Sequence, residues 1–175
     1  MRLFVAIDIP PELQALLDER VPNLPGWRKT KQEQLHITLL FLGDCSGGDL
    51  NRIQNILSGI PFDRFTLELN GLGIFPHQKN PKIVWAGIKR SNKPMELQSS
   101  ISEQLRGYGD GADHPEFIPH ITLARRKSGS GRDRNFEELL NEISTTGSFH
   151  VDRFLLKNSI LSLDGSRHEV IEEYQ

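Results

Sequence analysis

The tetrad His-Ile-Thr-Leu occurs twice in the chain, at residues 36–39 and at 120–123, each time within an apolar stretch. Stretches of this kind predict buried β-strands. Apolar residues at helical spacing precede each tetrad, from Pro11 and over 94–105, and follow it, over 49–60 and 136–143. Because helices and strands recur in the same order, we expect two similar lobes related by an approximate two-fold axis, each with one His-x-Thr motif.

This alternation favours an α+β fold with two antiparallel sheets, flanked by helices around a central cleft. No Gly/Ser-rich linker divides the halves, so residues 1–175 are expected to form a single bilobal domain. Strands are also predicted over 65–69 and 82–88, with a break at 71–76 between them. In the tail, strands are predicted over 149–156, 159–163 and 168–172, with Asp164-Gly165 as a hairpin turn.

Successive side chains of a strand point to opposite faces, so His36 and Thr38 share one face while Ile37 lies on the other. The same holds for His120 and Thr122. Imidazole, with an unperturbed pKa of about 6.5, is either acid or base near neutral pH. One histidine can take a proton from water while the other gives one to a departing ribose oxygen, and threonine hydroxyls can hold phosphate oxygens. One such motif is an ordinary polar strand face, but two matched copies favour phosphodiester chemistry.

Five segments together resemble the 2H phosphoesterase superfamily, and within it the RNA 2′,3′-cyclic phosphodiesterases, once called 2′-5′ RNA ligases. They are MRLFVAID at the start, HITLLFLG at 36–43, GLGIFP at 71–76, KIVWAGI at 82–88 and PHITLARR at 119–126. The similarity extends at least to NSILSLDG at 158–165 and so covers nearly the whole chain.

The resemblance implies a bilobal enzyme that uses neither metal nor cofactor. It hydrolyses RNA 2′,3′-cyclic phosphate ends to 2′-phosphates, with weak 2′-5′ RNA ligase activity in some members. His36 corresponds to the proton donor and His120 to the proton acceptor, although near-symmetric lobes hide which is which. Thr38, Thr122 and Arg125 correspond to the phosphate-binding residues. The alternatives are a phosphodiesterase for 2′-5′ oligonucleotides or cyclic nucleotides, and an RNA-end binding module without catalysis.

The other features of the sequence favour competing functions less strongly than the two His-x-Thr motifs favour phosphodiester chemistry. There is no HExxH motif and no acidic cluster beside either tetrad, so a metal site is not predicted. The four remaining histidines are expected to be solvated: His77, His114, His150 and His168. Three aromatic residues are given no site role: Trp27, Phe75 and Trp85. Two basic runs, 28–31 and 125–134, are solvated surface or guides for an RNA backbone.

The bulk composition limits how the protein can contact nucleic acid and in which compartment it is expected. A net charge of -2 argues against a protein that coats nucleic acid non-specifically, so any RNA contact must be local. Cys45 is the only cysteine, which fits a reducing compartment, and the cytoplasm is expected. No secretion signal or membrane-spanning segment is predicted. A monomer without an obligate protein partner is the expected state.

Overall fold

The computed structural model describes residues 1–175 except 77–79, 109–116, 130–139, 141–142, 144 and 163–164. The helices are α1 (Pro11–Arg20), the 3-10 helix η1 (Gln32–Gln34), α2 (Gly47–Ser58) and α3 (Asn92–Gln104). The strands are β1 (Arg2–Asp8), β2 (Trp27–Lys29), β3 (His36–Asp44), β4 (Phe65–Phe75), β5 (Ile83–Ile88), β6 (His120–Arg126), β7 (Ser148–Val151), β8 (Phe154–Ser162) and β9 (Gly165–Tyr174).

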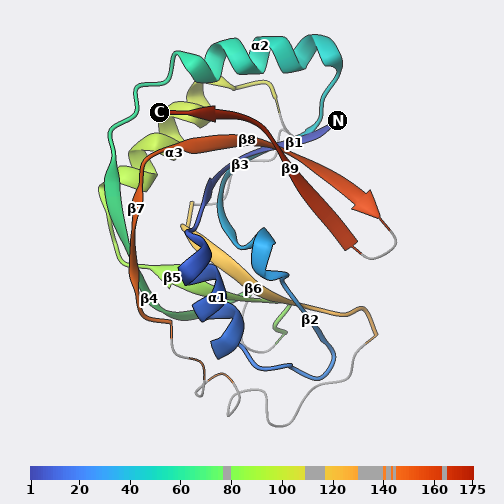
Figure 1. Cartoon of the computed structure of the whole chain (residues 1–175). Helices are drawn as coiled ribbons and strands as arrows, with labels where there is room; N and C mark the ends of the chain where they lie inside the picture. The colour runs from blue at the N-terminus through green and yellow to red at the C-terminus, as the bar shows by residue number, and fades with distance from the viewer. Residues whose placement is uncertain (77–79, 109–116, 130–139, 141–142, 144, 163–164) are drawn as a thin grey trace.

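The strands of the described residues form one continuous antiparallel path in the order β7-β4-β5-β6-β3-β1-β8-β9, with β2 alongside β6. This order is symmetric about its centre, because β3, β1, β8 and β9 take the places in one half that β6, β5, β4 and β7 take in the other. Figure 1 shows the path as a curve from β8 and β9 at the top to β5 and β6 at the bottom. The two sheets expected from the sequence are the two halves of this path, and the α+β class is confirmed.

The two halves meet at β3 and β6, which are the strands that carry the repeated tetrads. Their register contains a single residue pair, Ile37 opposite Ile121. Both side chains are fully buried. Burial of an isoleucine side chain contributes about 1.5–3 kcal/mol, so this pair is a strong apolar contact at the centre of the path. The pseudo-two-fold axis therefore passes between the two tetrads.

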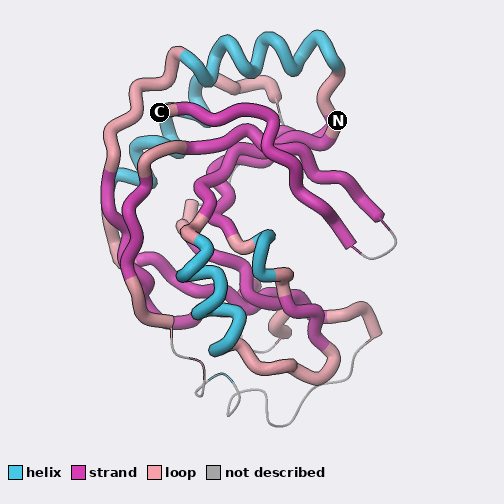
Figure 2. The backbone as a smooth tube through the Cα atoms, viewed as in Figure 1, coloured by secondary structure: helices cyan, strands magenta, loops and turns pink. Residues whose placement is uncertain are grey.

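The helices begin where local sequence dictates. Pro11 occupies the first turn of α1, where its missing N–H costs nothing, and Leu13 and Leu17 bury one side of the helix. Helix α2 begins at Gly47, two residues before the expected start, because Ser46 and Asp49 cap it reciprocally. Figure 2 shows α2 along the outer edge of the molecule, where it packs against β9.

Three predictions about strands were wrong. The segment 159–163 is not a strand of its own, because β8 continues without a break from Phe154 to Ser162. The segment 71–76 is no break, because β4 runs on to Phe75 and pairs with β5, with a register shift between Leu69 and Leu72 and a positive φ at Gly71. The single strand expected over 149–156 is two strands, β7 and β8, separated at Asp152-Arg153. Strand β7 pairs with β4 and β8 with β1, so this corner connects the two halves.

Most of the helix expected over 136–143 and part of the basic run 125–134 lie outside the described residues. In the described part of the chain, no helix is both long and apolar enough to cross a membrane.

Candidate active site

The two His-x-Thr motifs lie on one face of the β3–β6 junction. Because Ile37 opposes Ile121 in an antiparallel pair, His36 lies beside Thr122 and Thr38 beside His120. All four polar side chains point away from the buried isoleucines. The structure thus brings together the four residues that strand alternation predicted.

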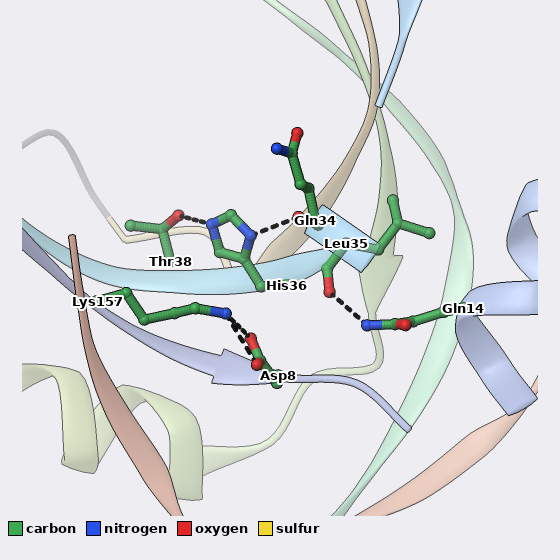
Figure 3. Close-up of polar contacts among 7 residues, drawn as sticks. All are labelled: Asp8, Gln14, Gln34, Leu35, His36, Thr38 and Lys157. Carbon is green, nitrogen blue, oxygen red and sulfur yellow. Dashed lines mark hydrogen bonds and ion pairs between the residues drawn. The ribbon is translucent and has the colours of Figure 1, made fainter. Parts of the chain in front are cut away.

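His36 is held in a defined orientation and tautomer (Figure 3). Its Nδ1 lies 2.6 Å from the carbonyl oxygen of Gln34 and its Nε2 lies 3.0 Å from Oγ1 of Thr38. A carbonyl oxygen only accepts hydrogen bonds, so Nδ1 carries the hydrogen. In the neutral ring, Nε2 then accepts from the Thr38 hydroxyl. His36 therefore presents its basic nitrogen next to a hydroxyl on the polar face.

His120 repeats this arrangement in the other half. Its Nδ1 lies 2.7 Å from the carbonyl oxygen of Ile118, again two residues earlier in the chain. Hence Nδ1 donates here as well, and the free imidazole presents Nε2 as its acceptor. The same backbone contact orients both rings and leaves Nε2 of each neutral imidazole as its acceptor nitrogen.

Arg125 joins this face through an irregularity in β6. Strict alternation from His120 and Thr122 would place Arg125 on the buried face. However, Trp85 of β5 opposes Thr122 and Val84 opposes Ala124, so Leu123 has no partner across the pair. This extra residue shifts the alternation, as β-bulges do, and puts the side chain of Arg125 on the polar face.

Strand β2 brings the two basic runs together. Arg28 opposes Arg125 in the antiparallel β2–β6 pair. Lys29 is tied to helix α1 by an ion pair of 3.0 Å with Asp18. The first basic run is thus adjacent to the tetrad of β6, a proximity that the sequence left open.

Two aromatic rings border the imidazole of His120. The ring centroids of Phe75 and Trp85 lie 5.0 and 5.7 Å from that of His120. Gly73 makes room for the indole, since a Cβ there would lie only 2.0 Å from Cζ2 of Trp85. Phe75 and Trp85 had no predicted site role, yet both border the imidazole. Trp27, in contrast, is buried in a separate small cluster.

His36 has different neighbours, and one of them corrects the sequence analysis. His168 of β9 was expected to be solvated, but its ring packs edge-on against His36 with a centroid distance of 5.2 Å. Its Nδ1 is buried without a hydrogen-bond partner among the described residues. The ring of Phe4 in β1 contacts the imidazoles of His36 and His168. His150 is exposed as predicted, and His77 and His114 lie outside the described residues.

An ion pair lies beside His36 and was also missed. Asp8 opposes His36 in the β1–β3 register, and Lys157 of β8 donates to both carboxylate oxygens of Asp8, at 2.6 and 2.8 Å. The signal available in the sequence was a charged residue inside the apolar run FLLK at 154–157. In the described residues, no three His, Cys, Asp or Glu side chains gather as a metal site.

The surroundings of both histidines favour the neutral ring. Removal from water lowers the pKa of His36 to about 3, and the charges of His168, Lys157 and Arg125 act in the same direction. Removal from water also lowers the pKa of His120, with a smaller contribution from Arg125. Arg125 thus lies close enough to both imidazoles to affect each of them. In the free protein at neutral pH, both histidines are proton acceptors.

Acid is therefore expected to destabilise the protein. The pKa of His36 is about 3 in the fold, against about 6.5 when unfolded, so the unfolded chain binds this proton first. The resulting stability is complete above pH ~6.5 and is lost as the pH falls towards the folded pKa, at no more than about 1.4 kcal/mol per pH unit. Urea unfolding at about pH 7 and about pH 5 should show a shallower pH dependence for His36→Gln than for wild type. Equal slopes would contradict this assignment.

This fold, with two histidine–threonine pairs facing one junction, defines a 2H phosphoesterase. Residues 9–158 match the family model of the 2′-5′ RNA ligase superfamily. The chain belongs to that superfamily.

Similarity to individual proteins supports the same family assignment. The chain is 31% identical to an RNA 2′,3′-cyclic phosphodiesterase of Archaeoglobus fulgidus, with 100% of both chains covered. It is 34% identical to one of Aeropyrum pernix, over 83% of this chain and 84% of the relative. Among solved structures, TT0787 of Thermus thermophilus has a TM-score of 0.81 at 28% identity, covering 99% of this chain and 96% of that one. Apo LigT of Escherichia coli has a TM-score of 0.78 at 26% identity, covering 98% and 95%.

Proposed function

We propose that this chain hydrolyses RNA 2′,3′-cyclic phosphate ends to 2′-phosphates, with His36 and His120 as its proton-transfer groups. The observation that carries the proposal is the matched pair of imidazoles at the β3–β6 junction, each oriented through Nδ1 by a backbone carbonyl. The similarity to curated RNA 2′,3′-cyclic phosphodiesterases supports the choice of substrate.

The reaction requires two proton transfers at opposite sides of one phosphorus atom. Nε2 of His120 takes a proton from water as the water oxygen attacks phosphorus. The bond between phosphorus and the ribose 3′-oxygen breaks, and Nε2 of protonated His36 gives its proton to that oxygen. The product carries a 3′-hydroxyl and a 2′-phosphate. Paired acid and base groups of this kind each contribute about 10²–10⁴ to a rate.

The neighbouring polar groups stabilise the charge that develops on phosphorus. The hydroxyls of Thr38 and Thr122 donate to non-bridging oxygens, and the guanidinium of Arg125 supplies positive charge on the same face. Oriented donors of this type gain strength in the transition state because they need no rearrangement. Arg28, opposite Arg125 on β2, extends the positive surface towards an RNA backbone.

We also propose that the protein acts as a monomer in the cytoplasm. One chain carries both motifs, so a monomer is sufficient for the reaction. Cys45 is a free, buried thiol in the described structure, which fits a reducing cytoplasm.

A product-resolved assay tests the activity. The purified protein is incubated with EDTA and an oligonucleotide that ends in a 2′,3′-cyclic phosphate, and phosphorus NMR identifies the product. We expect conversion to the 2′-phosphate at a rate that EDTA does not change, because the histidines alone move both protons. Parallel reactions contain a 2′-5′-linked dimer and a cyclic nucleotide. An intact cyclic end, a 3′-phosphate product, or turnover only with added metal would refute the proposal.

A further inference from the structure

The two halves of the site match in their histidines and threonines but differ in the next ring of residues. In the symmetric strand order β1 corresponds to β5, so the residue opposite each histidine is comparable. Asp8 opposes His36, whereas Gly87 opposes His120. A carboxylate therefore stands on one side where the other side has no side chain.

The same comparison holds one strand further out. Lys157 of β8 opposes Phe4, and the corresponding residue of β4 is Phe75, which opposes Ile83. His36 thus has an ammonium group at the position where His120 has a phenyl ring. The symmetry of the proton-transfer residues is broken by one ion pair.

That ion pair is an unusual element of a buried strand. The Lys157 side chain is 5% exposed, and the Asp8 side chain is 38% exposed. Figure 3 shows Lys157 reaching across β1 to Asp8, on the side of β3 that carries His36. Burial of an ammonium group carries a desolvation cost that an apolar residue at this position would avoid. Apolar residues precede Lys157 in β8, so packing alone does not explain a lysine here.

The charges around His36 together favour its neutral form. Among the described residues, the charged or titratable groups that face it are Asp8 of β1, Lys157 of β8, His168 of β9, and His120 and Arg125 of β6. Lys157, His168 and Arg125 each oppose a positive charge on His36, and the negative charge of Asp8 is compensated by Lys157. A proton donor in this position needs a further negative charge nearby. The phosphate of the substrate is such a charge.

We propose that Lys157 is a positioning residue that, together with burial, keeps His36 unprotonated in the free protein, and that Asp8 holds Lys157 in this place, so that His36 takes up its proton together with the anionic phosphate. This inference rests on the proposed role of His36 as proton donor. Each anion bound brings one proton from solvent to Nε2 of His36. The donor is thus assembled only when there is a phosphate to receive its proton.

Histidine-resolved NMR tests this without any turnover. Imidazole carbon and nitrogen shifts of His36 are followed from about pH 8 down to about pH 2.5, with and without inorganic sulfate, which remains mainly a dianion in this range. In wild type, sulfate is expected to raise the titration midpoint of His36 by about one pH unit or more, as a nearby opposite charge does. No shift, or protonation of His120 in place of His36, overturns the proposal.

Two variants of the ion pair distinguish charge from packing. Lys157→Met removes the ammonium and is expected to raise the midpoint of His36 by about one pH unit without sulfate. Asp8→Asn leaves the ammonium uncompensated and is expected to lower the midpoint. Loosened packing would raise it in both variants, so a rise in Asp8→Asn overturns the proposal.

A matched control keeps the charge. Lys157→Arg retains the cation beside Asp8 and is expected to titrate as wild type does, and departure from wild type in a folded Lys157→Arg overturns the proposal. Because sulfate binding involves no reaction, a negative NMR result is distinct from failure of the cyclic-phosphate assay. The first refutes coupled protonation and the second refutes the activity.

Discussion

His36→Ala and His120→Ala are each expected to lower kcat for opening of a 2′,3′-cyclic phosphate by about 10²–10⁴-fold. Each variant removes one of the two imidazoles whose Nδ1 is fixed by a backbone carbonyl, and the other imidazole cannot serve both ends of the reaction. Initial rates at saturating substrate, with product identified by phosphorus NMR, measure the effect. KM should change much less, because threonine hydroxyls and Arg125 still bind the phosphate.

The control for these variants is His150→Ala, since His150 is exposed in β7 on the outer strand of one half. It should retain wild-type activity. Survival of either site variant at a rate close to that of wild type would show that the two histidines do not work as an acid–base pair. The pH profiles of the residual activities also distinguish the proton donor from the proton acceptor. Loss of the donor removes the alkaline limb of the profile, and loss of the acceptor removes the acidic limb.

Ile37→Ala and Ile121→Ala are expected to reduce the free energy of unfolding by about 2–5 kcal/mol each. Both side chains are fully buried, and they form the single residue pair in the β3–β6 register. The cavity lies where the two halves meet, so the relative position of the two His-x-Thr motifs should suffer together with stability. Urea unfolding followed by tryptophan fluorescence measures the first effect, and kcat of the folded fraction measures the second.

Two milder changes serve as controls. Ile37→Val removes only a methyl group and is expected to cost about 0.5–1.5 kcal/mol. Leu161→Ala alters a side chain that is 69% exposed and should have little effect. If Ile37→Ala unfolds at the same urea concentration as Leu161→Ala, the junction does not hold the two halves together.

The central residues of the site could be found from the sequence because they depend on local rules. Alternation within a strand puts His36 with Thr38, and duplication of the tetrad pointed to a shared face. The register of β3 and β6 agrees, since Ile37 opposes Ile121. Arg125 came from family resemblance alone. Its side chain reaches the polar face because Leu123 has no partner in β5, and no feature of composition marks such a residue.

The surroundings of His36 could not be found in this way, because they depend on contacts between distant parts of the chain. Asp8, Lys157 and His168 come from β1, β8 and β9, and only the strand order brings them to β3. The corner at Asp152-Arg153 was missed for the same reason. The residues around it have a continuous strand composition, and the change of pairing partner from β4 to β1 is a property of the whole sheet.

The bulge at Leu123, which has no partner in β5, makes the pairing of β6 as important as its composition. Its counterpart in β3 is Leu39, which is also skipped in the pairing with β1. A β6 strand of the same length that paired with β5 without the bulge would turn the guanidinium of Arg125 towards the core, while His120 and Thr122 kept their places. Deletion of Leu123 would instead remove the bulge and leave Arg125 on the polar face, because Ala124 would then follow Thr122 directly. The bulge, and not the length of the strand by itself, therefore keeps the proposed anion recognition on the same face as the proposed proton transfer.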